Sequence, residues 1–248
     1  MVFLYSAAMT APANNDNSTG ASQPRDLESF WEYSDPTASE ARFRDALGGA
    51  KGDERLEILT QLARTYSLRK DFDTAHGILN EVEPQLGAAG PRPRARYLLE
   101  RGRTFNSAGD KDTARSHFLR GWELARESGE EGLAVDAAHM VAITYSGTAA
   151  GVEWNQKGLA MARGSRAPKS RALIPAMYNN MAWDLHDLKR HEEALTAFQK
   201  ALEEWTTTGR TKQIQVAKWS VAQGLRALGR DDEAAAIEKA LEAEGYKP

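Results

Sequence analysis

Five small residues recur at almost constant spacing, and this spacing constrains the fold more than any other feature of the chain. Ala63, Gly102, Ala142, Ala182 and Ala222 lie 39, 40, 40 and 40 residues apart. Each belongs to a run of apolar residues at helical spacing, which a turn and a second such run follow. A period of roughly 20 to 50 residues is typical of stacked units that cannot bury their apolar faces alone. The sequence therefore predicts an all-α solenoid of stacked antiparallel helix hairpins.

The fourth unit shows the pattern most clearly. Residues 178–205 read YNNMAWDLHDLKRHEEALTAFQKALEEW, with Tyr178, Met181-Ala182, Leu185, Ala194 and Phe198 at the repeating positions. This pattern resembles the tetratricopeptide repeat. The resemblance implies a right-handed superhelix whose first helices line a concave surface, and a role in binding. The period near 40 exceeds the family's usual value of about 34, and in length these units are similar to those of kinesin light chains and bacterial peptide-sensing regulators.

Polar composition and turn residues divide the chain. Residues 1–24 are predicted to be a disordered tail, because TAPANNDNSTGASQP has no apolar periodicity. Residues 25–248 are predicted to form the repeat domain, which begins with a degenerate hairpin that buries Phe30 and Trp31. In the third repeat Trp154 and Gly158 stand where alanine and an aromatic are expected, so its second helix should be shifted. The predicted segments are the hairpin 25–49 and repeats at about 53–87, 92–128, 132–164, 171–208 and 212–246.

Bulk composition excludes several classes of function. The net charge is −3 and the pI is near 6.0, whereas general nucleic-acid binding needs a basic stripe or a pI above about 9. The chain has no cysteine, so it has neither disulfides nor a catalytic thiolate. It contains no phosphate-binding loop, serine elbow or His-Glu-x-x-His motif, and its five histidines lack metal-site spacing. We therefore expect no enzyme activity, no cofactor and no metal.

The N-terminus opens with a short apolar run, MVFLYSAAM. It is short for a secretory signal and no lysine or arginine precedes it, so secretion is the weaker interpretation. Either Met1 or Met9 fits as the start. No stretch approaches the roughly 18 apolar residues of a membrane span, and a cytoplasmic location is expected.

The family resemblance also implies a binding groove. On each first helix, the ridge that faces away from the packed Leu/Ala/Tyr ridge should line the concave surface. This ridge has four arginines against two carboxylates, Glu57 and Asp136, so the groove is predicted to be more basic than the chain. Aromatic anchors are expected at Trp183 and Trp219. The predicted groove residues are Arg64, Arg96, Arg103, Asn106, His139, Asn179, Asn180, Trp183, His186, Trp219, Gln223 and Arg226.

Together these patterns predict a non-catalytic adaptor that binds a protein or peptide in its groove. The expected partner is an acidic segment with an apolar anchor, because arginines would steer acidic groups. Two alternatives remain open: a homo-oligomer that self-associates through its outer faces, and a small-molecule sensor that uses the groove as a pocket. The repeat pattern specifies no particular partner, because its defining residues are the buried ones.

Overall fold

The computed structural model describes residues 25–165 and 167–247. Within these residues every regular element is a helix, which confirms the predicted all-α fold. The predictions for the tail, residues 1–24, lie outside this range. The described residues form two compact units, 25–137 and 138–247. None of the helices described has both the length and the apolar character needed to cross a membrane.

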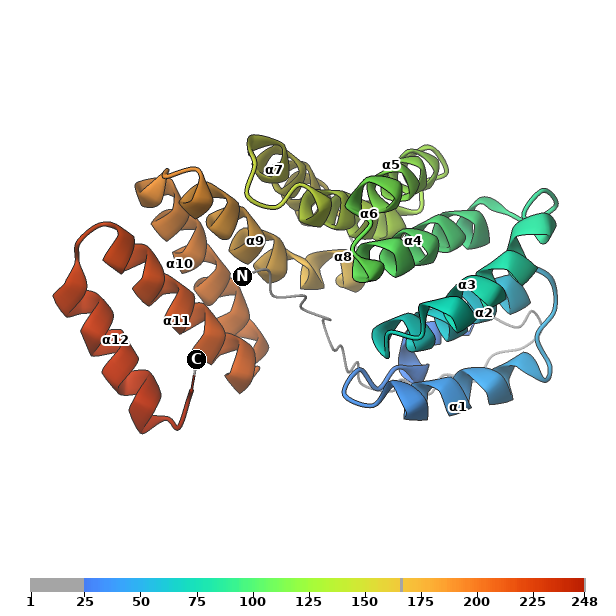
Figure 1. Ribbon diagram of the computed structural model, residues 1–248, viewed down its shortest axis with the longest axis horizontal. Coiled ribbons are helices and arrows are strands. Elements are labelled where there is room, and N and C mark those ends of the chain that lie inside the picture. The colour runs from blue at the N-terminus through green and yellow to red at the C-terminus, as the bar shows by residue number, and fades with distance from the viewer. Residues whose placement is uncertain (1–24, 166, 248) are drawn as a thin grey trace. The chain divides into compact units, whose positions relative to one another are not determined.

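The N-terminal unit contains a short entry segment and two helix hairpins (Figure 1). A 3-10 helix, η1 (Leu27–Phe30), and α1 (Pro36–Leu47) come first. Helix α2 packs on α3 and on α4, and α4 packs on α5. Helix α6 (Glu131–Thr144) begins in this unit and continues into the next. The hairpin helices are α2 (Gly52–Leu68), α3 (Phe72–Val82), η2 (Glu83–Gln85), α4 (Pro91–Ala108) and α5 (Lys111–Glu127).

The C-terminal unit continues the pattern. Helix α9 packs on α7 and α10, and α11 packs on α10 and α12 (Figure 1). A short helix, α8 (Pro168–Ala172), occupies the link before the fourth repeat. The other helices are α7 (Ala149–Gly164), α9 (Ile174–Asp187), α10 (His191–Thr208), α11 (Thr211–Ala227) and α12 (Asp231–Ala243). Five hairpins thus follow one another in the part of the chain that the structure describes, as the period predicts.

The recurring small residues lie where the two helices of a hairpin meet. All four alanines of the series are fully buried. At Gly102 an added Cβ would stand 2.5 Å from the ring of Phe118 on α5, which is closer than real Cβ contacts. The small residue therefore sets how closely the two helices approach.

The hairpin turns repeat as well. Lys70, Gly109, Lys189 and Gly229 all have left-handed backbone, with φ between 63° and 96°. In the α2–α3 and α4–α5 hairpins the next residue, Asp71 or Asp110, accepts a backbone N–H of the following helix and so caps it. The same left-handed backbone conformation therefore joins the helices of four hairpins, although only two of the four positions carry glycine.

The degenerate first hairpin is less helical than expected, because its first half is one 3-10 turn and an extended segment. Trp31 is 6% exposed and its ring lies 5.1 Å from that of Phe43 on α1. Phe30, predicted to be buried, is only half-buried, and its ring lies 5.6 Å from that of Phe43. Both neighbouring side chains thus make edge contacts with the same ring.

The third hairpin contains the shift that its sequence indicates. Helix α7 begins seven residues after Ala142, whereas the second helix begins nine residues after the small residue in the other hairpins. Val152 and Asn155 consequently take the buried positions, at 4% and 0% exposure, and Trp154 lies partly exposed. Gly158 faces Met177 of α9, whose sulfur would lie 2.6 Å from an added Cβ.

Candidate functional site

Of the twelve predicted groove residues, four belong to the N-terminal unit and eight to the C-terminal unit. In the N-terminal unit, Arg96 of α4 is 6% exposed and donates from Nε to Glu57 of α2 at 2.7 Å. The same carboxylate also accepts from Arg92 at 3.1 Å, and Arg92 reaches Glu130 at 3.1 Å. The charge of Arg96 is therefore matched within the unit.

Glu100 is the centre of a second ion-pair network. Its side chain is 2% exposed and accepts from Arg103 at 2.7 Å, while the guanidinium of Arg64 lies 3.6 Å away. Arg103 also donates to Asp136 of α6 at 2.6 Å. Burial alone lowers the pKa of Arg103, but the Asp136 and Glu100 carboxylates outweigh it and raise that pKa above its ordinary value. Arg103 is thus fixed as a buried, fully charged group.

These pairs correct the prediction of a basic groove in this unit. The sequence count included Glu57 and Asp136 but omitted Glu100, because Glu100 precedes the small residue Gly102 by two positions and was not placed on the ridge. Gln61 stands at the same repeat position as Glu100, and so does Asn180, which was predicted as a site residue. Because Asn180 was predicted to line the groove, the same repeat position could have identified Glu100 as a groove residue. Asn106, the fourth predicted residue here, is half-buried with a buried Oδ1 that has no hydrogen-bond partner.

The entry segment covers part of this surface. The Trp31 indole N–H donates to Gln61 at 3.1 Å, and Gln61 in turn donates to Glu100 at 3.2 Å. Tyr33 stacks on Trp31 with 4.9 Å between ring centroids, and the guanidinium of Arg64 lies 5.3 Å and 5.5 Å from the two rings. Burial raises the pKa of Tyr33 to about 12. Trp31 thus donates a hydrogen bond to the Gln61 side chain, and Trp31 and Tyr33 both stack against the Arg64 guanidinium.

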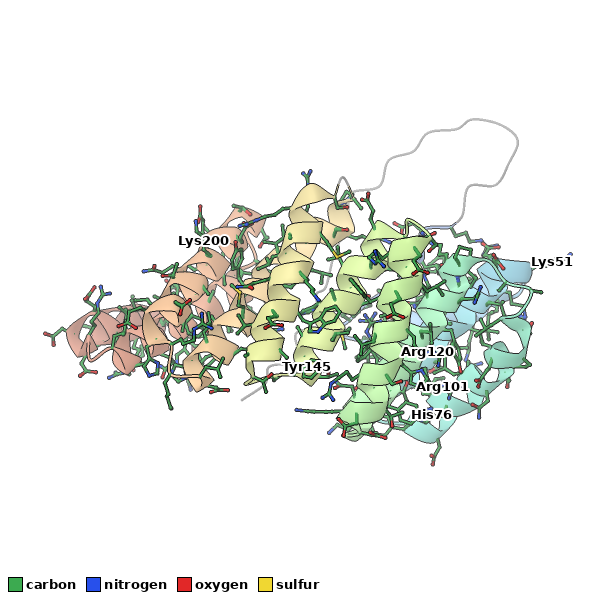
Figure 2. All side chains as sticks on the ribbon, turned by 90° about the horizontal axis from the view of Figure 1, so that it is seen from above. Lys51, His76, Arg101, Arg120, Tyr145 and Lys200 are labelled. Atoms are coloured by element: carbon green, nitrogen blue, oxygen red, sulfur yellow. The ribbon has the colours of Figure 1, made fainter. Side chains whose placement is uncertain are left out.

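A further polar cluster lies away from the predicted ridge, between α3, α4 and α5. Figure 2 shows His76 and Arg101 close together, and the Arg101 guanidinium donates to His76 Nδ1 at 2.8 Å. Phe105 lies between the imidazoles of His76 and His117, at 4.7 Å and 5.6 Å. Burial and nearby arginines lower the pKa of both histidines. These effects favour the neutral form of both imidazoles, and the cluster joins neighbouring hairpins.

In the C-terminal unit, two asparagines link neighbouring first helices. Asn180 of α9 bonds through Nδ2 to His139 Nε2 of α6 at 3.0 Å. Asn179 accepts from Ser220 of α11 through Oδ1 at 3.4 Å. Each of these contacts uses one end of the amide, so the Asn180 oxygen and the Asn179 nitrogen remain for other hydrogen bonds.

Trp183 is the centre of an aromatic cluster. Its ring lies 4.9 Å from Phe198 of α10, 5.4 Å from His186 and 5.9 Å from Trp219 of α11. Both tryptophans are partly exposed, and the Trp183 indole nitrogen has no hydrogen-bond partner. His186 also contacts His191, at 5.3 Å. The structure therefore brings together three predicted site residues, Trp183, His186 and Trp219, from two neighbouring helices.

Gln223 and Arg226 turn toward α12. Both reach Glu238, at 3.4 Å for Gln223 and 3.1 Å for Arg226 Nε, and Arg226 also lies 3.5 Å from Asp231. Both carboxylates belong to α12, the second helix of the same hairpin. The charge count made from the sequence covered first helices only and so did not include them. The fourth predicted cation is therefore also neutralised.

Asp184 is a buried carboxylate that the sequence did not single out. It is 4% exposed, accepts from the Gly147 backbone N–H at 2.7 Å and from Asn155 at 3.2 Å, and has no paired cation. Burial raises the pKa of Asp184 to about 7, against the opposing effect of these hydrogen bonds. It anchors the turn between α6 and α7 to α9. The described residues contain no group of three or more side chains arranged to hold a metal ion.

Comparisons with known proteins agree with this architecture. Residues 176–208, which form the fourth hairpin, match the family model of the tetratricopeptide repeat. No curated protein matches the sequence at a significant level.

Several solved structures share the fold at low sequence identity. BtubC (BKLC) from P. vanneervenii is 15% identical with a TM-score of 0.66, over 90% of this chain and 94% of that protein. Nearly identical TPR-like repeats of a Podosopora anserina kinesin light chain are 16% identical with a TM-score of 0.64, over 78% of this chain and 96% of theirs. A Rap protein complexed with Competence and Sporulation Factor is 18% identical with a TM-score of 0.62, over 88% of this chain and 62% of the Rap chain. Residues 176–208 thus match one tetratricopeptide repeat, and the described residues share the fold of these repeat structures, with units of about 40 residues.

Proposed function

We propose that this repeat protein binds a protein or peptide segment on the C-terminal unit, at a surface formed by Asn179, Asn180, Trp183, His186 and Trp219, here named the Trp183 surface. The observation that carries the proposal is the pair of partly exposed indoles on α9 and α11, whose rings lie 5.9 Å apart. Tryptophan is enriched among the few residues that contribute most of the binding energy of protein interfaces.

Two further features support a peptide-like partner. The Asn180 amide uses its nitrogen in the contact with His139 and keeps its oxygen, so the surface offers an acceptor to the N–H groups of a main chain. The Rap structure, which shares this fold, is a complex with Competence and Sporulation Factor. The acidic partner predicted from the sequence is not retained, because Arg64, Arg96, Arg103 and Arg226 are each matched by carboxylates.

Affinity capture followed by mass spectrometry tests the proposal. Trp219→Leu should remove the main captured partner, because an interface tryptophan typically contributes about 2 kcal/mol or more. Trp122→Leu, which replaces a partly exposed tryptophan of the N-terminal unit, serves as the matched control and should retain it. Melting curves of both variants establish that they are folded. Equal capture by a folded Trp219→Leu variant would contradict the proposed surface.

A further inference from the structure

One side-chain arrangement recurs within this protein: an arginine that stacks on an aromatic ring and also pairs with a carboxylate. Arg64 lies 5.3 Å from the Trp31 ring and 3.6 Å from the Glu100 carboxylate. A guanidinium in such a site gains from both the ring quadrupole and the anion. The same arrangement joins Arg69 with Tyr66 and Glu40, and Arg101 with Tyr97 and Glu83.

The end of α9 presents the ring and the carboxylate of this arrangement without the arginine. Trp183 and Asp187 are four residues apart, so they lie on the same face of the helix. The ring contacts of Trp183 are with Phe198, His186 and Trp219, and none of these is an arginine or lysine. The Asp187 side chain is 62% exposed, and the His186 imidazole lies 3.8 Å from its carboxylate.

We propose that Trp183 and Asp187 together bind an arginine side chain of the partner segment. The planar guanidinium would stack on the indole and donate to the Asp187 carboxylate, as Arg64 does with Trp31 and Glu100. The inference rests on the proposed function, since it specifies which residue of a bound segment occupies the Trp183 surface. It reverses the charge expected of the partner, because Asp187, beside Trp183, is an exposed anion.

Four pools of five-residue peptides, acetylated and amidated at the ends, test the inference. The central residue is arginine, citrulline, glutamate or leucine, and the flanking positions are mixtures of uncharged residues. Citrulline keeps the shape of arginine without its charge. The six tryptophans give six indole N–H signals in a nitrogen–proton correlation spectrum, so a shift at Trp183 is observed directly. The arginine pool should shift the Trp183 signal at lower concentration than the other three pools.

Two variants separate the carboxylate's role from a general change of the surface. Asp187→Asn should weaken the response to the arginine pool about threefold or more, as expected for losing one exposed ion pair beside a cation–π contact. Glu192→Gln, an exposed carboxylate at the start of α10, is the matched control and should leave it unchanged.

The outcomes separate the inference from the proposed function. Equal or tighter binding of the leucine or glutamate pool at Trp183 would overturn the arginine inference and leave peptide binding at this surface standing. The inference is also overturned if the arginine pool leaves the Trp183 signal unmoved or if Asp187→Asn has no effect. The capture experiment with Trp219→Leu judges the proposed function independently of these peptides.

Discussion

At the scale of single residues, the most unusual group in the described chain is Asp184. It is buried without a cation, and its raised pKa means that the folded protein holds a proton that the unfolded chain releases at lower pH. Between about pH 4 and pH 7 the unfolded state therefore binds fewer protons than the folded state. The linkage relation then requires the free energy of unfolding to fall as pH rises through this window, and to level off above it.

Asp184→Asn should remove this part of the pH dependence. Asparagine keeps an acceptor for the Gly147 N–H but cannot ionise, and the unpaired Asn155 oxygen can accept from its amide. We expect the variant to be more stable than the wild type at pH 8, by up to about 3 kcal/mol, and to gain less at pH 5. Urea unfolding from pH 4.5 to 8 measures this, with Asp232→Asn, an exposed carboxylate, as control. Parallel pH profiles for wild type and Asp184→Asn would refute the argument.

At the scale of helices, close approach within each hairpin depends on the small residue of the repeat. This part of the fold could be predicted from the sequence. The spacing of Ala63, Gly102 and their equivalents places each small residue on the apolar face of a helix, and this depends only on residues nearby in the chain. The two-residue shift of α7 was indicated by Trp154 and Gly158 but not located. Its position depends on where the turn ends, and the Asp184 carboxylate of α9 holds that turn by accepting the Gly147 N–H.

Two glycines in helices give a matched test of the helix contact. Gly102→Ala should destabilise the protein by about 1 to 3 kcal/mol, because the new methyl group would overlap the Phe118 ring. Gly77→Ala on α3 meets no atom within 4 Å and should stabilise it by about 0.5 to 1 kcal/mol through helix propensity. Thermal and denaturant unfolding of both variants measures whether the free energy of unfolding falls for Gly102→Ala and rises for Gly77→Ala. A stabilising Gly102→Ala would mean that α4 and α5 lie farther apart.

At the scale of the whole molecule, the described chain comprises two compact units, each a run of hairpins in contact mainly with their neighbours. Repeat proteins of this kind lose stability locally, because each unit depends on its own contacts and on those of adjacent units. Gly102→Ala should therefore accelerate amide hydrogen exchange in residues 91–127 much more than in residues 191–243. Exchange measured by mass spectrometry checks this, and equal acceleration in both segments would indicate a single cooperative unit.

The sequence by itself determined the helices, their pairing into hairpins and the buried small residues, because each follows from a period that adjacent residues carry. It also placed Trp183, His186 and Trp219 on one surface, since one helix face fixes two of them and the repeat fixes the third. The pairing of the arginines was decided only by tertiary structure. Glu57 and Glu100 approach Arg96 and Arg64 from neighbouring hairpins, and Glu238 reaches Arg226 from a second helix, at distances of 12 to 39 residues along the chain. A charge count along one ridge cannot include such partners, because packing brings them together from different helix faces.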